Sequence, residues 1–223
     1  MHEWMEDIME LIVTNISKKI KRNVILSNIS LHLKSGNIYG FVGPNGSGKT
    51  MLFRALSGLM KVGSGEIRLD EKVLKKDIDI LPNLGIILEN AGLYPEFTGM
   101  ENLEMLAKVN KKVQREEIEN TIRRVGLNPA DKRLYRKYSL GMKQRIVIAQ
   151  AIMEQPDILM LDEPTNALDE NGIDKIRHII LEEKERGALI LIASHNKEDI
   201  TLLADQVFYI NNGSLINQGG TLI

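Results

Sequence analysis

The sequence contains no cysteine, which excludes disulfide bonds and thiol chemistry. Its charges nearly cancel, with 29 Lys and Arg against 30 Asp and Glu, so we expect no nucleic-acid partner. No apolar run approaches the roughly 20 residues that a membrane-spanning helix needs. The four histidines show no spacing typical of a zinc site, and the acidic residues 1–7 lack the basic start of a signal peptide. We therefore expect a soluble cytoplasmic protein.

One loop matches the phosphate-binding pattern G-x-x-x-x-G-K-[ST] without a mismatch. Its residues are Gly43, Pro44, Asn45, Gly46, Ser47, Gly48, Lys49 and Thr50. An apolar stretch precedes this loop and a stretch without Gly or Pro follows, so we expect a strand before it and a helix after it. Gly43, Gly46 and Gly48 let the backbone take a positive φ and wrap around an anion at the positive end of the helix dipole. Lys49 is expected to bind the β- and γ-phosphates of a nucleoside triphosphate, and Thr50 to bind Mg²⁺.

Apolar patterns place β-rich segments on both sides of a helical insert. The predicted strands cover 11–13, 24–33, 37–42, 66–70, 84–88, 158–161 and 188–193, and Asn211 to Gly213 predicts a hairpin turn between two further strands. We expect a polar turn at 17–23, and we expect Gly63 to Gly65 to end the helix that follows the phosphate loop. Thr98 and Glu101 form a capping box, and Ser139 can cap a later helix that Pro156 stops.

Strands that alternate with helices indicate an α/β fold with a mostly parallel sheet and helices on both faces. We expect an N-terminal antiparallel β part in addition. The chain is predicted to be a single domain over 1–223. Within it, 11–88 and 154–217 would form the nucleotide-binding core, and 98–153 a helical subdomain.

Two carboxylates, Asp162 and Glu163, directly follow the apolar run 158–161. The carboxyl edge of a buried strand is where α/β sheets place their ligands. There Asp162 can hold Mg²⁺ through water, and Glu163 can polarise an attacking water as a general base. His195 follows another buried strand and could hydrogen-bond the γ-phosphate at the same edge. An isolated Asp-Glu pair is more often a solvated turn, and an isolated strand-end His a surface residue, but the phosphate loop favours the functional interpretation.

These blocks, in this order, resemble the ATPase subunit of ATP-binding cassette (ABC) transporters over about residues 11–217. The segment 138–145, Tyr-Ser-Leu-Gly-Met-Lys-Gln-Arg, is similar to the signature sequence of that family. The resemblance implies that two such domains pair head to tail around two ATP molecules. Ser139 and Gly141 would then serve the γ-phosphate bound by the partner, and Asp169 would cross the interface.

Three departures from the family pattern stand out. Glu89 occupies a position where the family usually has a Gln that touches the metal and the attacking water. The segment 89–103 resembles the version found in bacitracin-resistance and lantibiotic-immunity exporters, which carry this Glu. Ile20 stands where the family commonly places an aromatic residue against adenine, so it offers the base only apolar contact. The chain also stops soon after Asn217, where many relatives continue.

The resemblance implies a subunit that binds and hydrolyses ATP with Mg²⁺ and powers export of an antimicrobial peptide, lantibiotic or similar compound. It would work with a separate integral membrane permease, as a homodimer or a heterodimer with another ABC ATPase, on the inner face of the membrane. The loop 89–98 and the helical insert would form the docking groove for the permease, and Tyr94 and Phe97 would either contact the permease or pack within the loop.

Two alternatives remain at this point. One is a soluble ABC-type ATPase that acts on ribosome or DNA complexes, although those usually carry two cassettes or long coiled-coil inserts. The other is a nucleotide sensor without hydrolysis, which Glu163 and His195 argue against.

Overall fold

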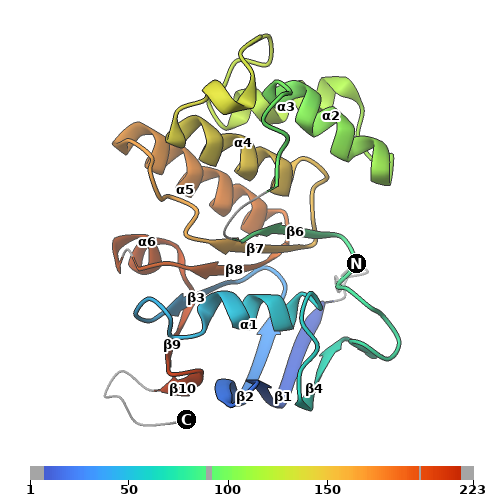
Figure 1. Ribbon diagram of the computed structural model, residues 1–223, viewed down its shortest axis with the longest axis vertical. Helices are drawn as coiled ribbons and strands as arrows, with labels where there is room; N and C mark the ends of the chain where they lie inside the picture. The colour runs from blue at the N-terminus through green and yellow to red at the C-terminus, as the bar shows by residue number, and fades with distance from the viewer. Residues whose placement is uncertain (1–7, 89–91, 196, 217–223) are drawn as a thin grey trace, which may run out of the picture.

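The computed structural model describes residues 8–88, 92–195 and 197–216 and builds them around two β-sheets (Figure 1). The larger sheet has six strands in the order β10-β9-β3-β8-β7-β6. Their bounds are β3 (Ile38–Val42), β6 (Leu84–Ile87), β7 (Ile158–Asp162), β8 (Leu189–Ala193), β9 (Gln206–Asn211) and β10 (Ser214–Ile216). All neighbouring strands pair in parallel except β9 and β10, which form the antiparallel hairpin. The expected mostly parallel sheet is therefore confirmed.

The second sheet is antiparallel, has the order β2-β1-β4-β5, and comes from the N-terminal part of the chain. Its strands are β1 (Glu10–Ile20), β2 (Asn23–Lys34), β4 (Ser64–Leu69) and β5 (Lys72–Val73). The predicted polar turn at 17–23 is confirmed only at residues 21 and 22, because β1 continues to Ile20 and pairs with β2 through irregular register. Ile16 is fully buried and anchors this extension, so charged residues alone do not end the strand.

The helix α1 (Lys49–Leu56) lies between the two sheets (Figure 1). Its Phe53 packs edge-on against Phe41 of β3 in a core that also contains residues of β1, β2, β7 and β8. The helix ends at Ser57, so the prediction that Gly63 to Gly65 end it was wrong. Those residues instead lead into β4, where the Gly65 backbone has a φ of +80°.

The other face of the larger sheet is covered by helices (Figure 1). They are α2 (Gly99–Asn110), α3 (Arg115–Arg124), α4 (Leu140–Ile152), α5 (Glu170–Glu185) and α6 (Lys197–Leu203), with a 3₁₀ turn at Tyr135–Lys137. The capping box of Thr98 and Glu101 is confirmed, and the Ser139 hydroxyl accepts a hydrogen bond from the Met142 amide. The division into a nucleotide-binding core and a helical subdomain stays a prediction. Within the described part of the chain, no helix combines the length and apolar character needed to cross a membrane.

Strand order decides where the candidate site lies. The strands β3, β8 and β7 are neighbours, and they run in the same direction. Their carboxyl ends lead into the loop at Gly43, into Ser194 and His195, and into Glu163. The sheet therefore brings three segments that are far apart in sequence to one edge.

Candidate functional site

A cleft of about 630 Å³ opens at this carboxyl edge of the sheet. Its lining residues are Asn45, Gly46, Ser47, Gly48, Lys49, Thr50, Met51, Asp162, Glu163, Asn166 and His195. All of these except Met51 and Asn166 are site residues predicted from the sequence. Asn166 lies three residues after Glu163, and that proximity was the signal for it.

The backbone of the loop fits an anion. Gly46 and Gly48 have φ angles of +79° and +111°, as expected, and Gly48 is the N-cap of α1. No side chain caps the helix start, so its first amides remain available to a ligand. Gly43 corrects the expectation, because its φ lies outside the left-handed region. Glycine is needed there for space, since a Cβ would lie 2.2 Å from the Ile210 carbonyl oxygen.

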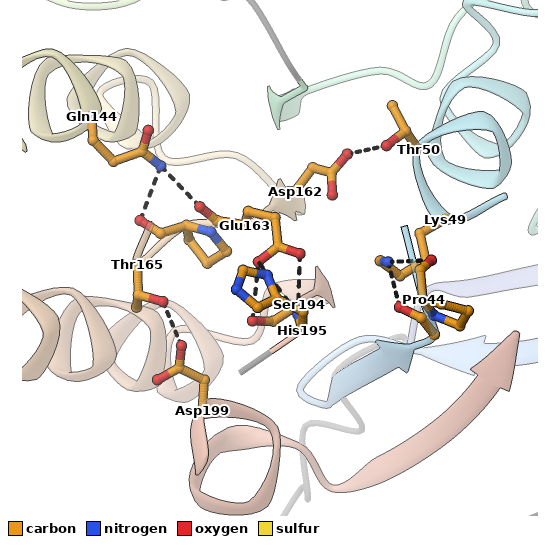
Figure 2. A network of polar contacts seen from close by, with 12 residues as sticks. Pro44, Lys49, Thr50, Gln144, Asp162, Glu163, Thr165, Ser194, His195 and Asp199 are labelled. Atoms are coloured by element: carbon orange, nitrogen blue, oxygen red, sulfur yellow. Dashed lines mark hydrogen bonds and ion pairs between the residues drawn. The ribbon is translucent and has the colours of Figure 1, made fainter. Parts of the chain in front are cut away.

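Lys49 is almost fully buried and its ammonium group stays within the loop (Figure 2). It donates hydrogen bonds to the carbonyl oxygens of Gly43 at 2.7 Å and Pro44 at 3.3 Å. The Ser47 hydroxyl is buried and has no hydrogen-bond partner in the described structure. A buried donor of this kind costs free energy unless it is satisfied, so its place in the cleft wall fits a bound phosphate.

Thr50, the last residue of the loop, and Asp162, at the end of β7, place two oxygen atoms together. The Thr50 hydroxyl lies 2.5 Å from a carboxylate oxygen of Asp162 (Figure 2). Hydroxyl and carboxylate oxygens are the hard donors that Mg²⁺ prefers, and Mg²⁺ commonly takes its other ligands from water and substrate phosphates. The residues present therefore fit a magnesium ion bound together with a nucleotide.

Glu163 points toward His195 (Figure 2). Its carboxylate lies 2.7 Å from His195 Nδ1 and accepts hydrogen bonds from the His195 amide at 3.0 Å and the Ser194 hydroxyl at 3.3 Å. The Glu163 backbone has a φ of +52°, an uncommon conformation for a residue with a side chain. Its amide donates to the Ala193 carbonyl oxygen at 2.8 Å, so this strained residue is tied to the end of β8.

The helix α4 also holds the segment that follows β7. The Gln144 side-chain amide donates to the carbonyl oxygens of Glu163 at 3.1 Å and Pro164 at 3.0 Å (Figure 2). Gln144 has no role among the predictions made from the sequence. Its place inside the segment 138–145 was the signal that it had one.

The other predicted site residues lie outside the lining of this cleft. Ser139 is exposed at the start of α4, and Gly141 packs so closely that a Cβ would lie 2.9 Å from the Ala167 carbonyl oxygen. The Asp169 side chain is 67% exposed and pairs at 2.5 Å with Arg145. Ile20 is 42% exposed at the end of β1, and Glu89 lies outside the described residues.

The arrangement suits chemistry on a phosphate. Backbone amides and Lys49 offer positive charge, and Thr50 and Asp162 offer metal ligands. Glu163 supplies a proton acceptor beside them, and its partner His195 is 65% exposed at the cleft surface. These are the parts needed to orient a water molecule toward a phosphorus atom.

The chain matches a known family and several individual proteins. The family model described as "ABC transporter" matches residues 26–166. An uncharacterised ABC transporter ATP-binding protein, YybJ of Bacillus subtilis, is 49% identical over 91% of this chain and 93% of its own length. The bacitracin transport ATP-binding protein BcrA of Bacillus licheniformis is 40% identical over 92% of this chain and 68% of its own length. The lantibiotic transport ATP-binding protein SrtF of Streptococcus pyogenes is 34% identical over 92% of this chain and 88% of its own length.

A solved structure supports the fold. A dimeric, post-hydrolysis state of the ATP-binding cassette MJ0796 with ADP and Pi aligns with a TM-score of 0.83. The alignment covers 93% of this chain and 97% of that one at 22% identity, so it bears on the fold alone. The resemblance seen in the sequence, including its bacitracin and lantibiotic relatives, is confirmed.

Proposed function

We propose that this chain hydrolyses ATP in the cleft between α1 and the ends of β7 and β8. The chain belongs to the ABC transporter family and corresponds to the ATP-binding subunit of such a transporter. The observation that carries this proposal is the convergence of Lys49, Thr50, Asp162, Glu163 and His195 on one cleft. Each type of group needed for phosphoryl transfer to water occurs there.

The roles follow from the positions of the side chains. The amides at the start of α1 and the Lys49 ammonium group bind the phosphates, Lys49 exchanging its bonds to the loop carbonyls for bonds to phosphate oxygens. Thr50 and Asp162 hold Mg²⁺, which supplies positive charge against the phosphate oxygens when it is bound.

Glu163 accepts the proton of the attacking water. His195 hydrogen-bonds the γ-phosphate and holds that water in line with it. Since the Glu163 carboxylate now contacts His195, one of its oxygens must turn toward the substrate before it can accept a proton. Glu163 and His195 both line the cleft, so rotation of the Glu163 side chain would turn its carboxylate toward the substrate.

We propose further that two cassettes close around ATP, with Ser139, Gly141 and Asp169 at the interface. Ser139 is exposed at a helix start, where the helix dipole favours a partner's phosphate, and the Asp169 carboxylate is largely exposed. The MJ0796 cassette, which has the same fold, is dimeric.

Dimer formation can be measured directly. Glu163→Gln is expected to bind ATP without consuming it and to elute as a dimer in size-exclusion chromatography when ATP and Mg²⁺ are present. Lys49→Ala in the same background should remain monomeric. A Glu163→Gln protein that stays monomeric at saturating ATP would contradict the head-to-tail dimer.

The transport role is proposed from the relatives that act in bacitracin and lantibiotic transport. The chain would drive a separate membrane permease from the cytoplasmic face and export a peptide antibiotic or similar compound. The segment 98–153 would serve as the helical subdomain, and its neighbouring loop would dock the permease.

Affinity purification of tagged Glu163→Gln from detergent-solubilised native membranes, with ATP, tests the partner. A polytopic membrane protein in the eluate is the expected result. Recovery of ribosomal or DNA-associated proteins alone would leave the ATPase chemistry in place but overturn the transport role.

A further inference from the structure

A buried ionic cluster lies beside the candidate site and is not used by the mechanism above. The Asp199 side chain of α6 is fully buried and binds two groups from other parts of the chain. One carboxylate oxygen accepts from Arg177 of α5, at 2.8 Å from Nε and 2.7 Å from Nη2. The other accepts a short hydrogen bond from the Thr165 hydroxyl (Figure 2).

The members of this cluster belong to the two segments that carry the site. Thr165 lies two residues after Glu163, and Asp199 lies four residues after His195. The hydrogen bond between them therefore joins the loop after β7 to the helix that follows β8. It runs beside the contact between the Glu163 carboxylate and the His195 imidazole (Figure 2).

The helix α6 is well placed to act as a fixed support. Its Ile200 and Leu203 are buried in the core under the sheet. Gly40 of β3 allows the close approach, since a Cβ there would lie 3.0 Å from Ala204 and from Ile200. Because α6 packs on the sheet and Arg177 of α5 binds the Asp199 carboxylate, this carboxylate is held in place. The Thr165 hydroxyl then links the loop after β7 to it.

Stability alone does not explain such a cluster. A buried ion pair often contributes little net stability, because desolvation of both charges offsets their attraction. What it does provide is a fixed geometry, since a buried carboxylate accepts only a partner at the correct place. Catalysis depends strongly on such positioning, and a displacement of about 1 Å can cost on the order of 10²-fold in rate.

We propose that Asp199 is a positioning residue for ATP hydrolysis, and that it sets the Glu163 carboxylate relative to His195 through the Thr165 hydroxyl. This inference rests on the proposed function of Glu163 as the proton acceptor. It predicts that loss of one hydroxyl, remote from the phosphates, lowers the rate of hydrolysis without weakening ATP binding.

Substitutions at Thr165 separate the hydroxyl from the rest of the side chain. Thr165→Val keeps the shape and removes the hydrogen bond, whereas Thr165→Ser keeps the hydrogen bond and removes the methyl group. Thr121→Val is a matched control, because Thr121 is similarly buried and its hydroxyl donates to the Glu117 carbonyl oxygen within α3.

Steady-state hydrolysis of Mg·ATP by the purified chain is the first readout, taken well below the melting temperature of each variant. We expect Thr165→Val to lower kcat about tenfold or more while KM for ATP changes less than about twofold. Thr165→Ser should restore kcat, and Thr121→Val should lower the melting temperature without changing kcat. Equal kcat values for Thr165→Val and the natural chain would overturn the proposal, as would equal losses in the Val and Ser variants.

A second readout does not depend on turnover. The chain has four histidines, so the imidazole signals of His195 can be assigned by NMR with the help of His195→Gln. We expect Thr165→Val to shift these signals and Thr165→Ser and Thr121→Val to leave them in place. If the natural chain shows no hydrolysis, the proposed function fails, and this measurement still decides whether the Thr165 link positions Glu163 against His195. Unshifted His195 signals in Thr165→Val would refute the link.

Discussion

Gly85 permits the contact between β6 and α4, and its replacement by alanine should disturb the whole site. A Cβ at this position would lie 2.1 Å from the carbonyl oxygen of Ala151, near the end of α4. It would also lie 2.9 Å from Pro156 and 3.0 Å from Leu159. The φ angle of Gly85 lies outside the left-handed region, so the cost comes from space rather than backbone strain.

The size of the effect follows from these distances. Cβ atoms essentially never come closer than 3.0 Å to such an atom, and here the distance would be 2.1 Å. The strand β6 and the helix α4 must therefore move apart by about 0.9 Å. The obstacle is a backbone oxygen that cannot rotate away, and we therefore expect the upper end of the usual cost of overpacking, about 3 kcal/mol. For a chain of this length, that corresponds to a melting temperature lower by about 6–12 °C.

Function should change together with stability. Because α4 carries Gln144, which binds the carbonyl oxygens next to Glu163, a displaced α4 should also lower kcat in the folded protein. Gly92→Ala is the matched control, since a Cβ there meets no atom within 4 Å. Calorimetry on both variants is the assay. A Gly85→Ala protein that melts at the same temperature as the Gly92→Ala control would refute the close packing of β6 against α4.

Three further substitutions test separate parts of the account. Lys49→Ala should weaken ATP binding about 10- to 100-fold, the worth of a charged hydrogen bond, and an unchanged affinity in calorimetric titration would exclude its role at the phosphates. Ile20→Tyr should tighten ATP binding about two- to tenfold if the adenine base lies against the end of β1, and an unchanged affinity would place the base elsewhere. Burial raises the pKa of Asp205, but hydrogen bonds from the Ile38 amide and Lys184 outweigh this, so its pKa lies below the ordinary value. A lowered pKa gives stability that is present above the unfolded value and is lost as the pH falls through the folded one. Asp205→Asn should therefore destabilise the protein at pH 7, and urea unfolding should show that the difference from the natural chain shrinks below about pH 4. A difference that stays constant from pH 7 to pH 3 would contradict this.

Local patterns in the sequence were enough to find the main parts of the site. The phosphate loop, the apolar run before Asp162 and the strand before His195 each depend on neighbouring residues, and their common edge follows from a parallel sheet. The Thr98 capping box and the Asn211 hairpin turn are local in the same way, and both are confirmed.

Features that depend on distant contacts could not be predicted. The extension of β1 through a charged stretch is decided by pairing with β2 and by the burial of Ile16. The hydrogen bond between Thr165 and Asp199 joins residues that are 34 positions apart in the sequence, so no local sequence pattern predicts it. Gly43 is similar, because the atom that requires glycine there belongs to Ile210.

The central claim is that Glu163 accepts the proton of the water that attacks ATP. Phosphate release from Mg·ATP by the natural chain and by Glu163→Gln, with ATP affinity measured on both, tests it most directly. We expect the substitution to lower turnover by about 10²- to 10⁴-fold and to leave ATP binding intact. A Glu163→Gln protein that releases phosphate as fast as the natural chain would contradict it.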